Sequence, residues 1–161
     1  MVSFTAETMK PNTLRMSASD ETPRSRISVA EPVWSDVEMR IERAFQYGGK
    51  VKLEALEQDP EQGYALFVKE SIDMEALHGG FRIIVNPGKK LGQKTNLREW
   101  WEPEDRPFRG TDRFGDDEWD SRTVCTDISV AKQMFMEFFD GRGITEAITN
   151  QTLSVWDRKP R

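Results

Sequence analysis

Alternation of apolar and charged residues in the middle of the chain constrains the fold most strongly. Residues 51–56 read Val-Lys-Leu-Glu-Ala-Leu, and two further strand-like segments follow at 64–68 and 81–85. Gly, Pro, Asp and Asn residues separate the three segments. A period of two is typical of a strand with one buried face, and turn residues between such strands favour antiparallel neighbours. The pattern therefore predicts an antiparallel meander.

Two segments have helical periodicity instead. Residues 35–47 carry apolar side chains at intervals of three and four, and Ser35 and Glu38 have the spacing of a capping box. A more apolar helix is expected from 127 or 129 to 140, where glycines end it. Residues 122–126 and 153–156 are expected to add strands, and Thr145 to cap a short helical turn. The predicted fold class is α+β, with an antiparallel sheet of about four to five strands packed against two main helices.

A length of 161 residues suits one domain. Residues 1–33 are rich in Ser, Thr, Pro and charge, so we expect an N-terminal arm, partly flexible, in which Val2–Thr5 forms a short edge strand. Residues 34–161 are expected to form a single α+β domain.

Charge and cysteine content narrow the possible partners. The formal net charge is −5, and the acid excess lies at 34–80. No segment is basic enough to predict direct binding of nucleic acid, whereas a basic protein partner would be attracted. Cys125 is the single cysteine, which excludes an internal disulfide and is typical of a reducing compartment. No apolar run is long enough to cross a bilayer. We therefore expect a cytoplasmic protein with no membrane partner.

The sequence gives little indication of a catalytic site. His78 is the single histidine, so a Ser-His-Asp or Cys-His system would have to use it, with Cys125 as the one thiol. His78 precedes two glycines in a predicted turn, and Cys125 lies in a predicted strand, where a buried, inert thiol is usual. Glycine-rich phosphate loops are also missing. The sequence predicts no catalytic residues and no cofactor.

The densest polar feature is a group of four carboxylates, at Asp116, Asp117, Glu118 and Asp120. Oxygen ligands of this kind could hold Ca²⁺ or Mg²⁺, but the spacing does not follow a calcium loop. The acids could instead pair with neighbouring arginines, or recognise a basic partner. Three tryptophans lie nearby and would act as anchors if exposed. The predicted partner-binding residues are Trp100, Trp101, Asp116, Asp117, Glu118, Trp119 and Asp120.

The C-terminal half resembles small bacterial immunity proteins of polymorphic toxin systems. The similarity rests on residues 108–110, 115–124, 135–139 and 154–157. It implies a cytoplasmic antidote that binds a cognate toxin, for example a basic nuclease-like domain, and blocks its active site or substrate path. Two alternatives stay open: a homo-oligomeric scaffold, and a metal-dependent enzyme that uses the acids at 116–120.

Overall fold

A computed structural model of the chain describes residues 12–21, 24–59, 61, 63, 65–77, 79–88 and 96–161. Within these ranges the chain has an α+β fold with nine strands, three α-helices and two short 3-10 helices. The strands are β1 (Thr13–Glu21), β2 (Arg24–Ala30), β3 (Gly49–Asp59), β4 (Ala65–Leu77), β5 (Gly80–Asn86), β6 (Arg98–Trp100), β7 (Thr111–Phe114), β8 (Asp117–Asp120) and β9 (Thr152–Ser154). The helices are α1 (Trp34–Tyr47), α2 (Ile128–Gly141) and α3 (Glu146–Asn150), with 3-10 turns at Ser121–Thr123 and Val155–Asp157.

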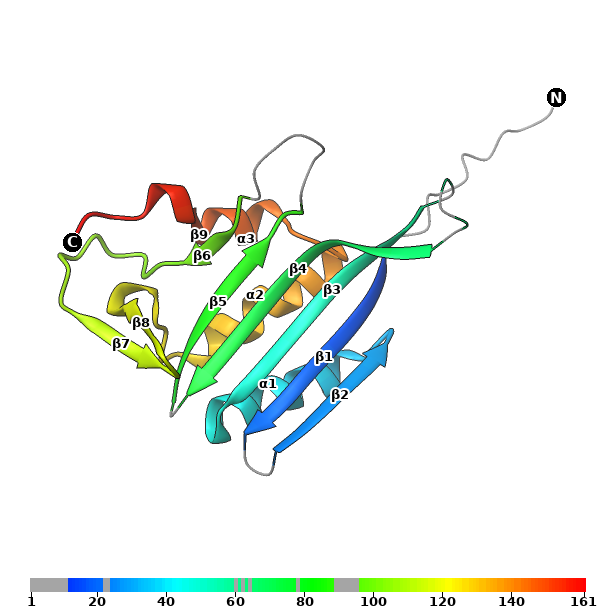
Figure 1. Ribbon diagram of the computed structural model, residues 1–161, viewed down its shortest axis with the longest axis horizontal. Coiled ribbons are helices and arrows are strands. Elements are labelled where there is room, and N and C mark those ends of the chain that lie inside the picture. The colour runs from blue at the N-terminus through cyan, green and yellow to red at the C-terminus, as the bar shows by residue number, and fades with distance from the viewer. Residues whose placement is uncertain are drawn as a thin grey trace.

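Seven strands form one antiparallel sheet in the order β2-β1-β3-β4-β5-β6-β9. The predicted meander is confirmed as β3, β4 and β5 at its centre, and these strands are longer than the sequence segments that predicted them. Strands β7 and β8 pair only with each other and lie beside β5 (Figure 1). The α+β class is therefore correct, but the sheet has more strands than expected.

One face of the sheet carries the hydrophobic core. Helix α1 contacts β1, β3 and β4, helix α2 contacts β3 and β4, and the two helices contact each other (Figure 1). Both predicted helical stripes face the sheet, through Val37 and Ile41 of α1 and Phe135 and Phe138 of α2, all fully buried. Phe45 of α1 packs edge-on against Phe81 of β5, with ring centroids 6.1 Å apart. Burial of these large side chains is the main force that holds the helices on the sheet.

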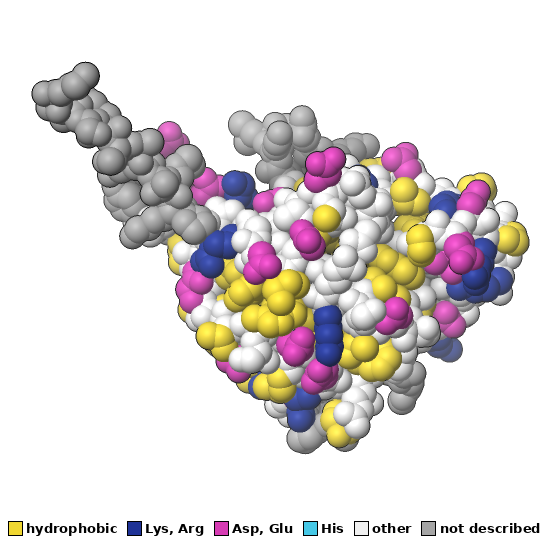
Figure 2. All heavy atoms as spheres, turned by 180° about the vertical axis from the view of Figure 1, so that it is seen from behind, with side chains coloured by type: hydrophobic (Ala, Val, Ile, Leu, Met, Phe, Trp, Pro, Cys, Tyr) yellow, Lys and Arg dark blue, Asp and Glu magenta, His cyan; other side chains and the backbone are white. Residues whose placement is uncertain are grey.

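The opposite face of the sheet is polar, and none of the described helices lies on it (Figure 1). Cross-strand ion pairs follow the register on this face, with Lys52 3.4 Å from Asp73 and Arg15 3.0 Å from Glu54. On the helical side, shown in Figure 2, acidic and basic groups are scattered among apolar ones. Among the described residues, no helix is both long and apolar enough to cross a membrane.

The largest difference between the predicted and the observed fold concerns the N-terminal segment, which was expected to be an arm. Residues 13–30 form β1 and β2, and Leu14, Met16 and Ala18 of β1 are buried against the helices. Asp20 of β1 accepts hydrogen bonds from Arg40 and Arg43 of α1, each at 3.2 Å. This segment is thus part of the main sheet. The strand expected at Val2–Thr5 lies outside the described residues.

Three local predictions also need correction. Helix α1 begins one residue early, with Val33 as N-cap and no side-chain cap, so Ser35 and Glu38 form no capping box. Residues 122–126 form a 3-10 turn and an isolated bridge between Cys125 and Phe81 in place of a strand. The terminal strand ends at Ser154, and a 3-10 turn follows. Thr145 does cap α3 by accepting a hydrogen bond from Ile148 N, as expected.

Candidate partner-binding site

The acids predicted as partner contacts lie on a short hairpin beside the polar face of the sheet. Strands β7 and β8 are joined by a two-residue turn at Gly115 and Asp116, and Gly115 has φ +60°, which favours glycine. Asp116, Asp117 and Glu118 are exposed, as is Asp112 on β7. Within the described part of the chain, none of these four carboxylates forms an ion pair. These carboxylates are therefore accessible to form ion pairs with another molecule.

The base of the hairpin is fixed by Asp120 and its neighbour Arg122. The buried Arg122 guanidinium donates to Asp120 through Nε (3.0 Å) and Nη2 (2.8 Å), a bidentate pair. Arg122 also donates to the main-chain oxygens of Arg106 and Pro160, so it joins three segments. The hydrogen bonds from Arg122 hold the pKa of Asp120 below its usual range. Asp120 is thus a structural ion-pair partner of Arg122, and its predicted role as a partner contact stays untested.

Trp119 fixes the hairpin to the sheet. Its ring is half-buried and lies over the guanidinium of Arg82, with 3.3 Å between the Arg82 Cζ and the ring centroid. Arg82 lies on β5, is only 2% exposed, and donates from Nη2 to Glu99 Oε2 on β6 at 3.0 Å. Arg158 near the C-terminus donates to the other oxygen of Glu99 at 3.1 Å. Arg82 is thus stacked on Trp119 and paired with Glu99, which also accepts from Arg158. These contacts link the hairpin, the sheet and the C-terminal segment.

Trp100 and Trp101, which were also predicted as partner contacts, are buried. They are 7% and 5% exposed, and Trp100 belongs to the hydrophobic core. The Trp101 ring lies 5.1 Å from Arg122 Cζ. Because a buried ring offers little surface to a partner, this burial argues against the two residues as contacts, and their predicted role stays untested. Five of the seven predicted residues, 116–120, do lie together on the hairpin.

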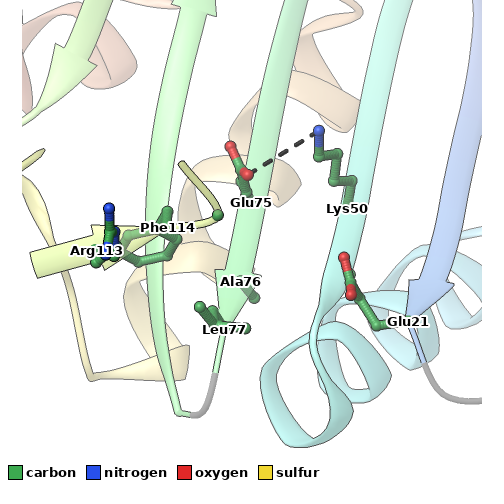
Figure 3. A pocket seen from close by; sticks show the side chains of 9 residues that line it. Glu21, Lys50, Glu75, Ala76, Leu77, Arg113 and Phe114 are labelled. Atoms are coloured by element: carbon green, nitrogen blue, oxygen red, sulfur yellow. Dashed lines mark ion pairs between the residues drawn. The ribbon is translucent and has the colours of Figure 1, made fainter. Parts of the chain in front are cut away.

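A groove of about 450 Å³ separates the hairpin from the ends of β3 and β4. Figure 3 shows its charged residues, which are Glu21, Lys50 and Glu75 on the sheet and Arg113 on the hairpin. Lys50 Nζ and Glu75 Oε1 are 4.0 Å apart and well exposed, so this pair is weak. Ala76, Leu77 and Phe114 add an apolar part. Ala76 and Phe114 are only 4% and 5% exposed, so the groove offers a partner mainly its charged side chains.

Neither the candidate nucleophile nor the candidate metal ligands form a reactive site. Cys125 is 5% exposed, and burial raises the pKa of its thiol, which makes it a poor nucleophile. His78 lies outside the described residues. Within those residues, no three His, Cys, Asp or Glu side chains are grouped so as to hold a metal ion. The acids at 116–120 are thus not arranged as a metal centre.

The groove residues were not predicted as functional, although their sequence carried a signal. Lys50 and Lys52 lie at alternate positions of β3, and Glu75 and Asp73 face them across β4 in register. The alternation shows that these residues share the polar face. The position of Lys50 and Glu75 in one groove with Arg113 depends on the tertiary position of the hairpin, which no local pattern contains.

The fold and site define an open-faced α+β domain with a helical layer on one side of its sheet. A family of unknown function, DUF6911, matches residues 13–148, and the chain belongs to it. In three dimensions the chain is similar to a hypothetical protein from Neisseria gonorrhoeae, with a TM-score of 0.60 and 11% identity over 86% of this chain and 94% of that one. At this identity the similarity shows a shared fold alone. No curated protein matches the chain.

Proposed function

We propose that this chain is a non-catalytic inhibitory binding protein of the immunity type, which in the cytoplasm blocks the active site or substrate path of a toxin with a basic surface. The observation that carries the proposal is the hairpin, where Asp112, Asp116, Asp117 and Glu118 are exposed and unpaired among the described residues. Nothing in the comparisons or in these residues indicates a catalytic activity.

Rigidity of the hairpin supports recognition. The stack of Trp119 on Arg82 and the bidentate pair between Arg122 and Asp120 hold the strand that bears Asp117 and Glu118. A pre-formed surface loses less conformational entropy on binding than a flexible one. Fixed carboxylates would imitate the spaced charges of a phosphate backbone, the substrate of a nuclease-like toxin.

The test is co-expression with candidate toxic domains, taken from any secreted protein whose gene neighbours the gene of this chain. We expect restored growth, and co-purification that weakens as salt is raised, because exposed charges are screened. The variant D116N/D117N/E118Q should weaken binding about tenfold or more. The matched control D36N/D140N/D157N removes the same amount of charge from exposed carboxylates elsewhere and should bind normally. Absence of both binding and protection would refute the proposal.

A further inference from the structure

The polar face of the sheet is hollowed over β1, β2 and β3, on the face that no described helix covers (Figure 1). The hollow has a volume of about 390 Å³, and we name it the sheet hollow. Ser19 of β1 pairs in register with Arg26 of β2 and with Lys50 of β3, so these three side chains form one row. In the next row Ser17 pairs with Lys52. Because serine is much shorter than lysine or arginine, the space lies above the serines and between the cations.

The donors of the sheet hollow have few partners. Arg26 is exposed and forms no ion pair with any described residue. The hydroxyls of Ser17 and Ser19 likewise form no hydrogen bond within the described part of the chain. Lys50 Nζ lies 4.0 Å from Glu75 Oε1, a weak and exposed pair (Figure 3). The row therefore offers a guanidinium, a hydroxyl and an ammonium group to an anion.

These three groups suit a phosphate. Two strand spacings separate Arg26 from Lys50, about 10 Å between backbones, and two long side chains can close that span around one anion over Ser19. Arginine binds a phosphate through two parallel N–H groups, lysine binds it as a point charge, and a serine hydroxyl donates to a further oxygen. A phosphate monoester carries up to two negative charges at neutral pH, which strengthens each of these contacts.

The far side of the sheet hollow is acidic. Glu54 of β3 and Asp73 of β4 also line it. Glu54 lies 3.0 Å from Arg15, and Asp73 lies 3.4 Å from Lys52, so a cation opposes each acid. Carboxylates accept hydrogen bonds from hydroxyl groups, but they would repel a second phosphate. The hollow therefore favours a ligand with a phosphate at one end and hydroxyl groups at the other.

We infer that the sheet hollow binds a small hydroxylated phosphate monoester, such as a sugar phosphate. Its phosphate lies over Ser19 between Arg26 and Lys50, and its hydroxyls lie toward Glu54 and Asp73. The volume is within the range of roughly 300–1,000 Å³ that is usual for small-molecule sites. The inference is independent of the proposed function, because no lining residue of the hollow belongs to the hairpin, and failure of toxin binding would leave it unaffected.

The probe is glucose 6-phosphate, titrated into the full chain by isothermal titration calorimetry. The buffer is free of phosphate and has physiological ionic strength, so that attraction between distant charges is screened. We expect saturable binding of one ligand per chain. Glucose lacks the phosphate and inorganic phosphate lacks the hydroxyls, so each should bind about tenfold more weakly or not at all. Vesicles of phosphatidylcholine and phosphatidic acid present a lipid phosphate and should not displace the sugar phosphate.

Variants of the chain locate the site. Arg26→Gln should weaken binding about tenfold or more, because a charge-assisted hydrogen bond is lost. Arg24→Gln is the matched control, because Arg24 is exposed on the same face of β2 but does not line the hollow, and its affinity should change less than about threefold. Ser19→Val keeps every charge but fills the space and removes the hydroxyl, and it should also weaken binding about tenfold.

Several results would overturn the inference. They are the absence of saturable binding, retained affinity in Arg26→Gln or in a folded Ser19→Val, and an equal loss in Arg24→Gln. Equal affinity for inorganic phosphate or for glucose, or displacement by the vesicles, would do the same. Circular dichroism of each variant shows whether it is folded, and Lys50→Gln replaces any variant that is not, with the same expected loss.

Discussion

The guanidinium of Arg82 lies 3.3 Å from the centre of the Trp119 ring, a contact that joins a strand at the middle of the sheet to the acidic hairpin. Burial lowers the pKa of Arg82, and the neighbouring Glu99 carboxylate opposes that shift. Arg82 thus stays paired in a site with little water, where a stacked ring replaces part of its lost hydration. Stability and presentation of the binding surface depend on the same contact.

Removal of the Trp119 ring should therefore affect both properties. We expect Trp119→Ala to lower the free energy of unfolding by about 2–3 kcal/mol, because a desolvated stack and its buried area are lost. Trp119→Phe, which keeps a ring over Arg82, should lose less. Urea denaturation followed by circular dichroism measures the difference. Equal stability of Trp119→Ala and the natural protein would show that the stack contributes nothing.

The Arg82–Glu99 pair should show strong energetic coupling. Arg82→Met leaves the 2%-exposed Glu99 with Arg158 alone and should cost about 3–5 kcal/mol. The double variant R82M/E99M removes both charges and should be clearly more stable than the sum of the two single variants predicts. A double-mutant cycle from urea denaturation gives the coupling energy. Simple additivity would contradict a direct interaction.

The centre of the fold could be predicted from the sequence because its signals are local. The alternation at 51–56 and the apolar stripe of the second helix correspond to β3 and α2. A similar alternation of Leu14, Met16 and Ala18 predicts β1 equally well, but the Ser- and Thr-rich surroundings favoured a linker. The failed capping box shows that spacing alone does not fix a helix end, because α1 begins at Trp34.

The candidate site was predictable in part. A cluster of exposed acids can be found by composition, and 116–118 are exposed on the hairpin. The burial of Trp100 and Trp101 could not be found in this way, because it depends on tertiary packing: Trp100 joins the hydrophobic core, and Trp101 lies near Arg122 and Lys159. The stack of Trp119 on Arg82 is likewise a tertiary contact across 37 positions (119 − 82).

Because of Asp120, the free energy of unfolding should decrease as the pH falls into the acidic range. Its pKa is lowered in the folded protein by hydrogen bonds from Arg122, from an ordinary value of 3.8. The unfolded chain then binds the proton first, so the stabilisation from Asp120 is complete above pH 3.8 and is lost as the pH falls through the lowered value. Asp120→Asn should be less stable than the natural protein at neutral pH, and the gap should narrow in acid. Urea denaturation over a pH series tests this, and a constant gap would refute it.

Asp73 should show the opposite dependence. Burial raises its pKa above the ordinary 3.8, and Lys52 only partly offsets the shift. The folded protein therefore holds this proton longer than the unfolded chain, so the contribution of Asp73 to stability declines as the pH rises from 3.8 through the raised value. The stability of Asp73→Asn relative to the natural protein should increase over that interval. A decrease over the same interval would show that attraction by Lys52 outweighs burial.

The thiol of Cys125 should report on opening of the fold. Main-chain hydrogen bonds join Cys125 to Phe81 in both directions, at 2.8 and 2.9 Å, and Sγ donates to Asp127 O at 3.6 Å. Because the thiol is buried and its pKa is raised above 9.0, we expect Ellman's reagent at pH 8 to modify the folded protein on the order of a hundredfold more slowly than the urea-unfolded chain. Where the thiol reacts through global unfolding, the logarithm of its modification rate should rise linearly with the loss of unfolding free energy in destabilised variants such as Arg82→Met. Cys125→Ser is the control, because it removes the one cysteine and should give no signal. Rapid modification of the folded natural protein would contradict the burial of this side chain.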